Sequence, residues 1–219
     1  MTTDPEKLNE AIALLAHTQS QKRKSGAKRL RKLADRQAGP AILAALQKEL
    51  LDPRTWSAQY QMILALGFCE YRPALPFIWE LARRETEHTT LYHGLGDAIV
   101  RIGHDSASDM TPVFETIDNG RFQLINGALQ AMALLRMIPS ESEIIELLRI
   151  AELPAAVQAV RGYPNDPRGL RQWVAAAAAG WPRELVLEFL NRCLPSTDHQ
   201  LQLAAEQSLK GRYVKWSPY

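Results

Sequence analysis

The sequence contains only two cysteines, Cys69 and Cys193, among 219 residues. Two such distant cysteines build no disulfide framework and lack the spacing of a metal site. The chain also lacks a run of about 18 apolar residues, which a membrane helix requires. Its first residues do not show the basic-then-apolar order of a secretory signal. These absences favour a cytoplasmic protein and give no reason to expect a membrane partner.

Signals for β-strands are scarce as well. No stretch maintains period-2 alternation of β-branched residues, and no Asn-Gly or Asp-Gly hairpin turn joins two apolar runs. Apolar residues instead recur at i, i+3, i+4 and i+7, with Pro and Gly between the segments. The sequence therefore predicts an all-α protein. The expected helices span 4–17, 20–37, 40–51, 55–67, 73–84, 88–102, 107–118, 121–137, 141–152, 155–161, 168–179, 182–193 and 197–210, and a long irregular connection is expected within 153–167.

Two segments of the chain align with each other without a gap. ILALGFCEYRPALPFIWEL (63–81) pairs with IVRIGHDSASDMTPVFETI (99–117), so that Leu66-Gly67 matches Ile102-Gly103. Looser copies are found at 128–148 and 28–46. First helices of successive pairs begin near 20, 55, 88 and 121, a period of about 34 residues that is typical of a solenoid of two-helix units.

An apolar helix ending in Leu-Gly or Ile-Gly, a short polar turn and a Pro inside a second apolar helix resemble the HEAT repeat in its short bacterial form. The resemblance is clear over 55–118, fair over 20–54 and 119–152, and weak beyond 153. It implies a right-handed α-α superhelix of about five helix pairs with helical caps. The expected organisation is one domain over 1–219, with the clearest repeats at 20–152 and divergent pairs at 153–219. Tyr213 and Trp216 are expected to cover the last apolar face.

Residues that could build a catalytic or metal site are scattered. His88 and His93 are five residues apart, so they do not share a helical face as a zinc pair at i, i+4 would. Ser25 and Lys28 match an S-x-x-K motif whose companion motifs are missing. The chain has no G-x-S-x-G motif, no phosphate-binding glycine loop and no Rossmann fingerprint. The sequence therefore predicts a protein that is not an enzyme and has no cofactor or metal.

Residues 19–36 hold eight basic side chains and one acid, Asp35, whereas the whole chain carries a net charge of +2. At about 100° per residue, the cations share one face of the predicted helix, and Leu30, Leu33 and Ala34 share the other. Two interpretations remain open: a solvated outer face of an end repeat, or a patch that binds phosphate or an acidic partner. The candidate patch consists of Lys24, Lys28, Arg29, Arg31, Lys32 and Arg36.

The second helices carry the opposite charge in the middle of the array. In HEAT-like stacks these helices normally line the concave binding surface, and the resemblance extends this expectation to the present chain. The predicted helices at 107–118 and 141–152 each carry a net charge of −3. Trp79 is a natural interface anchor if it points outward. The expected partner-binding residues are Trp79, Glu80, Glu115, Asp118, Glu143, Glu146 and Arg149.

Three functions compete. The first is a protein-binding module with a basic partner, most concretely an immunity protein that neutralises a cationic toxin or nuclease domain. The second is a nucleic-acid-binding protein similar to the HEAT-like DNA alkylation-repair glycosylases, for which Trp56, Trp79 and Asp97 are candidate residues. The third is an enzyme similar to the phycobilin lyases, which also carry short HEAT-like repeats. The acidic second helices favour the first.

Overall fold

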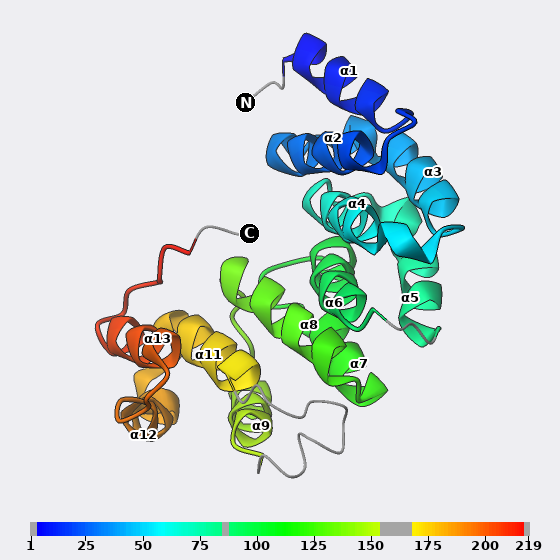
Figure 1. Cartoon of the computed structure of the whole chain (residues 1–219). Coiled ribbons are helices and arrows are strands. Elements are labelled where there is room, and N and C mark those ends of the chain that lie inside the picture. The colour runs from blue at the N-terminus through cyan, green and yellow to red at the C-terminus, as the bar shows by residue number, and fades with distance from the viewer. Residues whose placement is uncertain (1–3, 85–87, 154–167, 217–219) are drawn as a thin grey trace. The chain divides into compact units, whose positions relative to one another are not determined.

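The protein is all-α in its computed structural model, as predicted (Figure 1). The structure describes residues 4–84, 88–153 and 168–216, and these residues contain α-helices and short 3-10 helices but no strand. The expected helix at 155–161 and the expected connection within 153–167 lie outside the described residues, apart from Leu153. Most remaining helix boundaries agree with the sequence prediction to within four residues.

The chain divides into two compact units, Met1–Gly103 (unit 1) and His104–Tyr219 (unit 2). Unit 1 contains α1 (Pro5–Leu14), α2 (Ser20–Leu33), α3 (Gly39–Glu49), α4 (Trp56–Phe68), α5 (Leu75–Arg83) and α6 (Thr90–Gly103). Unit 2 contains α7 (Thr111–Asn119), α8 (Phe122–Leu134), α9 (Glu141–Ala151), α11 (Arg168–Ala177), α12 (Arg183–Cys193) and α13 (His199–Leu209). The single domain over 1–219 stays a prediction.

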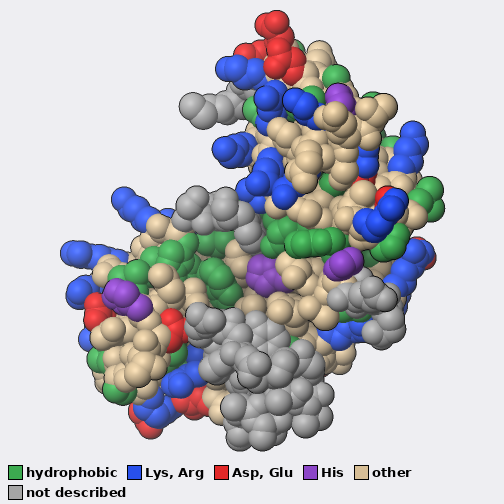
Figure 2. All heavy atoms as spheres, viewed as in Figure 1, with side chains coloured by type: hydrophobic (Ala, Val, Ile, Leu, Met, Phe, Trp, Pro, Cys, Tyr) green, Lys and Arg blue, Asp and Glu red, His purple; other side chains and the backbone are tan. Residues whose placement is uncertain are grey.

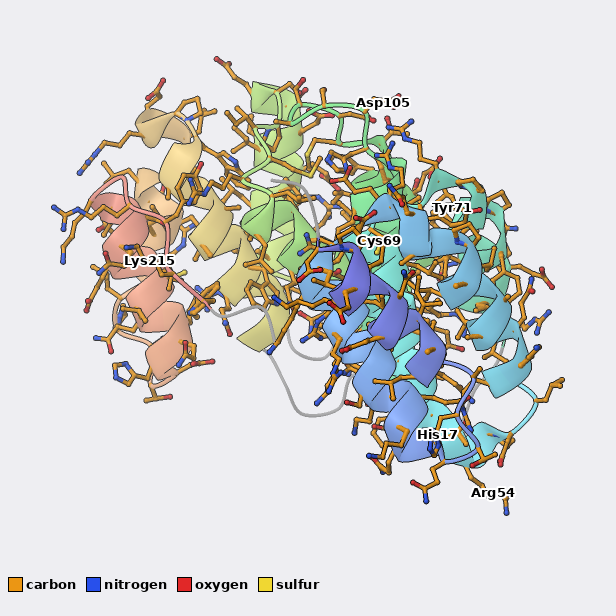
Figure 3. All side chains as sticks on the ribbon, turned by 90° about the horizontal axis from the view of Figure 1, so that it is seen from above. His17, Arg54, Cys69, Tyr71, Asp105 and Lys215 are labelled. Atoms are coloured by element: carbon orange, nitrogen blue, oxygen red, sulfur yellow. The ribbon has the colours of Figure 1, made fainter. Side chains whose placement is uncertain are left out.

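Unit 1 is built around a row of three helices, because α4 packs between α2 and α6 (Figure 1). Its second helices lie beside this row, α3 against α4 and α5 against α6, and α1 packs on α2. His17 and Arg54, which precede α2 and α4, lie at one end of unit 1, whereas Cys69 and Tyr71, which follow α4, lie at the other (Figure 3). The helices α2 and α4 are therefore parallel.

The same local structure follows the first two helices of this row. After α2, Ala34 adopts the left-handed conformation with φ 51°, and the 3-10 helix Arg36–Ala38 leads into α3. After α4, Glu70 adopts it with φ 48°, and the 3-10 helix Arg72–Ala74 leads into α5. A two-helix unit therefore recurs within unit 1. Its assignment to the HEAT repeat and the right-handed superhelix stay predictions.

The helix predicted at 20–37 is too long, since α2 ends at Leu33. A left-handed residue at Ala34 stops the α-helical hydrogen bonds, and the Asp35 carboxylate accepts a hydrogen bond from Gln37 N at 2.9 Å. Asp35 therefore acts as the N-cap of the next turn. Arg36 consequently belongs to the 3-10 helix and not to the cationic face of α2.

Unit 2 has a second row, in which α11 packs between α8 and α13. α7 packs on α8, α9 contacts α11 and α12, and α12 packs on α13. The chain after α13 returns to the end of this row. The Arg136 guanidinium lies 4.6 Å from the centre of the Tyr213 ring, and Trp216 meets Trp173 edge-on with ring centres 4.8 Å apart. Tyr213 and Trp216 therefore contact the turn after α8 and α11, whereas their expected covering of the last apolar face stays a prediction.

Candidate functional site

The exposed face of α2 is cationic. Lys22, Lys28, Arg29 and Lys32 are exposed and Lys24 is half-buried. Within the residues that the structure describes, none of these five side chains forms an ion pair. Figure 2 shows Lys and Arg side chains gathered over α2. We call these five residues the α2 cationic face.

Several charges of the α2 cationic face oppose the usual electrostatics of a helix, although Lys32 in the last turn is placed as the helix dipole favours. The first turn of α2 has no acidic residue and contains Lys22, although the positive end of the helix dipole favours acids there. Lys24, Lys28 and Lys32 follow one another at i, i+4 and i+8, and like charges at i, i+4 repel by about 0.2–0.5 kcal/mol per pair. The stability of the helix therefore does not explain this arrangement.

Arg31 is the one member of the predicted patch that faces the interior. Its side chain is 6% exposed, and its Nη1 donates a hydrogen bond to Gln61 Oε1 at 3.0 Å. Its guanidinium also lies 5.9 Å from the centre of the Phe68 ring. The prediction that Arg31 belongs to the exposed patch is wrong, because this edge of α2 contacts α4. Arg36 is exposed, but it pairs with Glu70 at 3.2 Å.

Arg101 on α6 contacts the same Phe68 ring, with its guanidinium 4.0 Å from the ring centre. Its Nε donates to Oδ1 of the fully buried Asp97 at 2.7 Å. The Phe68 ring on α4 thus contacts one guanidinium from α2 and another from α6, and these cation–π contacts link the three helices of the row. Asp97, the acid named for the glycosylase hypothesis, is engaged in this buried ion pair. The cluster of Arg31, Gln61, Phe68 and Arg101 was missed, because it forms only between helices.

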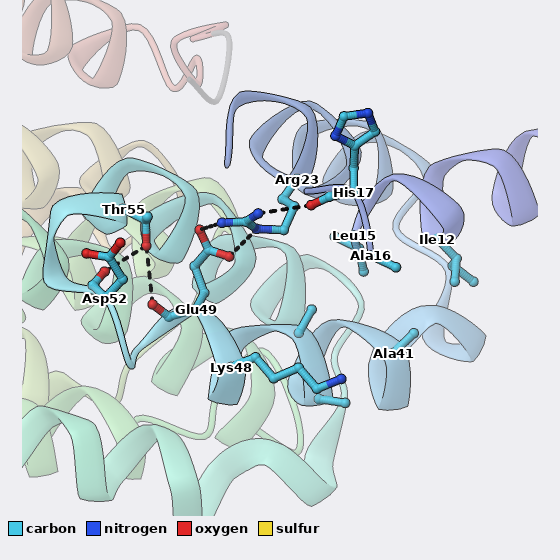
Figure 4. A pocket seen from close by; sticks show the side chains of 12 residues that line it. Ile12, Leu15, Ala16, His17, Arg23, Ala41, Lys48, Glu49, Asp52 and Thr55 are labelled. Carbon is cyan, nitrogen blue, oxygen red and sulfur yellow. Dashed lines mark hydrogen bonds and ion pairs between the residues drawn. The ribbon is translucent and has the colours of Figure 1, made fainter. Parts of the chain in front are cut away.

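A pocket of about 460 Å³ lies between α1, α2 and α3 (Figure 4). The buried Glu49 carboxylate accepts hydrogen bonds from Arg23, with Nη2 at 2.8 Å and a second contact from Nε, and from Ser20 Oγ at 3.2 Å. Arg23 Nη1 also donates to the carbonyl oxygens of His17 and Thr18. The hydrogen bond with Glu49 raises the pKa of Arg23. These polar groups bind one another and join the α1–α2 turn to α3.

Two of the predicted acidic binding residues serve α9 itself. Ser140 and Glu143 form a capping box, and both Ser140 N and Ser140 Oγ donate to Glu143 Oε2 at 2.7 Å. Glu146 pairs with Arg149 at 2.6 Å, and the hydrogen bond from Arg149 lowers the pKa of Glu146. Local helix structure therefore accounts for Glu143, Glu146 and Arg149.

Glu115 and Asp118 on α7 differ from the acids of α9. Both are exposed, and neither forms an ion pair or a side-chain hydrogen bond with any residue in the described ranges. Asp118 lies in the last turn of α7, where the helix dipole disfavours an acid, and that turn contains no basic residue. These two acids remain available to a partner.

The predicted anchor Trp79 and its neighbour Glu80 lie in unit 1, whereas the other predicted partner-binding residues lie in unit 2. Trp79 is half-buried, with the Arg83 guanidinium 6.0 Å from its ring centre. Glu80 pairs with Arg84 at 2.5 Å. Trp56, the other aromatic candidate, stacks on His88 with ring centres 5.5 Å apart. Each of these side chains therefore has a partner close in its own unit.

Neither thiol is activated as a nucleophile. Burial raises the pKa of Cys69 to about 12, and burial also raises the pKa of Cys193. Both thiols are therefore protonated at neutral pH, whereas a nucleophilic cysteine requires a lowered pKa. The described part of the chain contains no group of three or more His, Cys, Asp or Glu side chains that could hold a metal ion.

Among the described helices, none combines the length and the apolar character needed to span a bilayer. No protein-family model matches the chain, and the comparison with curated proteins finds no significant relative. The all-α architecture and the charges of single helices therefore carry the functional argument.

Proposed function

We propose that the protein is a non-catalytic module that binds the phosphate backbone of nucleic acid through the α2 cationic face. One observation carries this proposal: five cations share that face, and no acidic side chain of the described residues pairs with them. Proteins depart from local helix rules mainly where function requires it. Bound phosphates would relieve the repulsion among Lys24, Lys28 and Lys32.

The arrangement suits contact with a backbone rather than with base edges. Lysine ammonium groups act as point charges, and phosphate contacts carry no sequence information of their own. Lys24 to Lys32 spans about 12 Å at 1.5 Å per residue. The contacts of Arg31 with Gln61 and Phe68 hold α2 against α4. The α2 cationic face therefore lies on a helix whose position is fixed by packing. We therefore expect binding that is independent of sequence and strongly dependent on salt.

The test compares two triple variants with the same change in net charge. Lys24→Glu/Lys28→Glu/Lys32→Glu alters the α2 cationic face, and Lys48→Glu/Lys210→Glu/Arg212→Glu alters exposed cations elsewhere. Anisotropy of labelled duplex and single-stranded oligonucleotides at about 50 mM salt should show at least a roughly 100-fold loss for the α2 variant and less than about threefold for its control.

Equal losses in the two variants would mean that only total charge matters, and the proposal would be wrong. Binding to polyglutamate but not to either oligonucleotide would also overturn it, since the partner would then be an acidic protein.

A second candidate function rests on Glu115 and Asp118. Because both acids lack partners among the described residues, α7 can offer negative charge to a basic protein, as an immunity protein would to a cationic toxin or nuclease domain. Co-purification from the native host should recover a basic protein with the wild type and lose it with Glu115→Lys/Asp118→Lys. A control variant, Glu141→Lys/Glu184→Lys on α9 and α12, should retain it. A basic partner retained by the α7 variant would rule out this surface.

A further inference from the structure

The last described residues of unit 2, Tyr213 to Trp216, form a non-helical tail that lies against the end of α8, α11 and the following turn. Arg136 covers the Tyr213 ring, and Trp173 meets the ring of Trp216. The fit at Gly180 is close: a Cβ atom at this position would lie 2.0 Å from Tyr213 Oη. We call Arg136, Trp173 and Gly180 the tail site.

The tail is held in place by contacts of its side chains and not by hydrogen bonds of its backbone. The last backbone hydrogen bond in the described chain runs from Arg212 N to Gln207 O, at 2.9 Å. Between Tyr213 and Trp216, no backbone hydrogen bond to another described backbone group is formed. The contacts that hold the tail are thus the two aromatic side chains, three residues apart. Segments attached in this way open at low free energy compared with a core helix.

The two tryptophans of this region differ in how well their indole nitrogens are satisfied. Trp181 Nε1 donates a hydrogen bond to Met137 O at 3.0 Å, so this buried donor has an acceptor. Trp216 Nε1 is buried and finds no acceptor among the described residues. Buried indole donors normally have a partner. The tail therefore fills the tail site by shape and leaves its indole donor without an acceptor among the described residues.

We propose that the tail site is a binding site for an extended peptide segment of a partner protein that carries two aromatic residues three apart, and that the chain's own Tyr213-x-x-Trp216 is a displaceable occupant. The tail shows the chemistry of the ligand directly: a phenol ring under a guanidinium, and an indole against Trp173. A tethered segment has an effective concentration on the order of millimolar. The tail thus prevents weakly binding peptides from occupying the tail site, whereas a peptide that binds more tightly displaces it.

The test uses full-length chains and a fluorescein-labelled peptide of residues 210–219, KGRYVKWSPY. The Tyr213→Ala/Trp216→Ala variant should release its tail and bind the peptide at least about tenfold more tightly than the wild type, whose tail competes in cis. Adding Gly180→Leu to this variant should abolish binding, because the side chain fills the place of the Tyr213 hydroxyl. A peptide with both aromatics replaced by Ala is the matched control.

Equal peptide affinity for the wild type and the released variant would overturn the proposal, as would binding of the Ala-substituted peptide. If the released variant does not fold by circular dichroism, the wild type labelled with 5-fluorotryptophan provides a second measurement. Unlabelled peptide at several millimolar should then shift the fluorine resonances of Trp173 and Trp216 and leave those of Trp56 and Trp79 in place. Unshifted signals, or tail exchange between two copies detected as a dimer by light scattering, would also contradict it.

Discussion

α2 and α9 both carry a dense set of like charges, but the two sets have different causes. On α9, Glu141 and Glu143 complement the helix dipole, Glu143 caps the helix, and Glu146 pairs with Arg149. On α2, Lys22 opposes the dipole, the row Lys24, Lys28 and Lys32 is mutually repulsive, and none of these lysines has an ion-pair partner in the described parts of the chain. A count of charges alone does not distinguish these two causes.

The difference teaches where a charged surface needs a functional explanation. An acid that caps or pairs within its own helix contributes to folding, so its presence says little about a partner. A cation that lowers the stability of its own helix requires another reason to be there. For this reason the proposed function rests on α2, and the acids of α9, which the sequence favoured, are left out of it.

The largest expected effect concerns a cation of α2 that does have a partner. Glu49→Ala leaves Arg23 half-buried without its carboxylate, and removing one member of a buried pair costs about 3–5 kcal/mol. The free energy of unfolding in urea should fall by about this amount. The exposed Glu141→Ala should change it little, and a loss below about 1 kcal/mol for Glu49→Ala would show that the pair does not anchor α2.

On α9, Ser140→Ala removes the serine of the capping box and should lower the free energy of unfolding by about 1 kcal/mol. Urea unfolding measures the change, and the exposed Gln47→Ala on α3, which is not part of a cap, is the control. Without a difference between the two, the claim that Glu143 and Ser140 serve α9 would lose its basis.

On α2, Lys28→Glu should act in the opposite direction on stability and on binding. The new acid replaces two repulsive i, i+4 pairs, with Lys24 and Lys32, by two attractive ones, which should raise the free energy of unfolding by about 0.8–2 kcal/mol. Affinity for an oligonucleotide should fall by roughly tenfold at low salt. If Lys28→Glu lowers the free energy of unfolding, the lysines stabilise α2, and the contrast drawn between α2 and α9 is wrong.

The smallest expected effect is a pH dependence. Because Arg149 lowers the pKa of Glu146, this pair stabilises the fold fully above the unfolded pKa and less as pH falls through the folded one. The Glu146→Gln variant should therefore show a slightly flatter loss of stability between about pH 5 and 3. Urea unfolding at several pH values tests this. The exposed Glu115→Gln on α7 is the control, and an identical pH profile for both variants would contradict the assignment.

Much of the architecture could be predicted from periodicity, including twelve of the thirteen expected helices, while the remaining one lies outside the described residues. The end of α2 was misplaced, since a left-handed alanine such as Ala34 has no sequence signature of its own. The role of Glu143 could have been found, because Ser140-x-x-Glu143 is a capping-box pattern before an apolar run. The burial of Arg31 could not have been found from the sequence, because it depends on the positions of Gln61 and Phe68 on α4.

The most direct test of the account is the salt dependence of oligonucleotide binding by the wild type and the Lys24→Glu/Lys28→Glu/Lys32→Glu variant. If the five cations of the α2 cationic face contact phosphates, a plot of log K against log salt should have a slope of about −4.5 for a duplex. The variant should show a slope shallower by about 2.7 or no binding at all. A flat wild-type plot, or the same slope for both proteins, would contradict the claim that α2 carries the function.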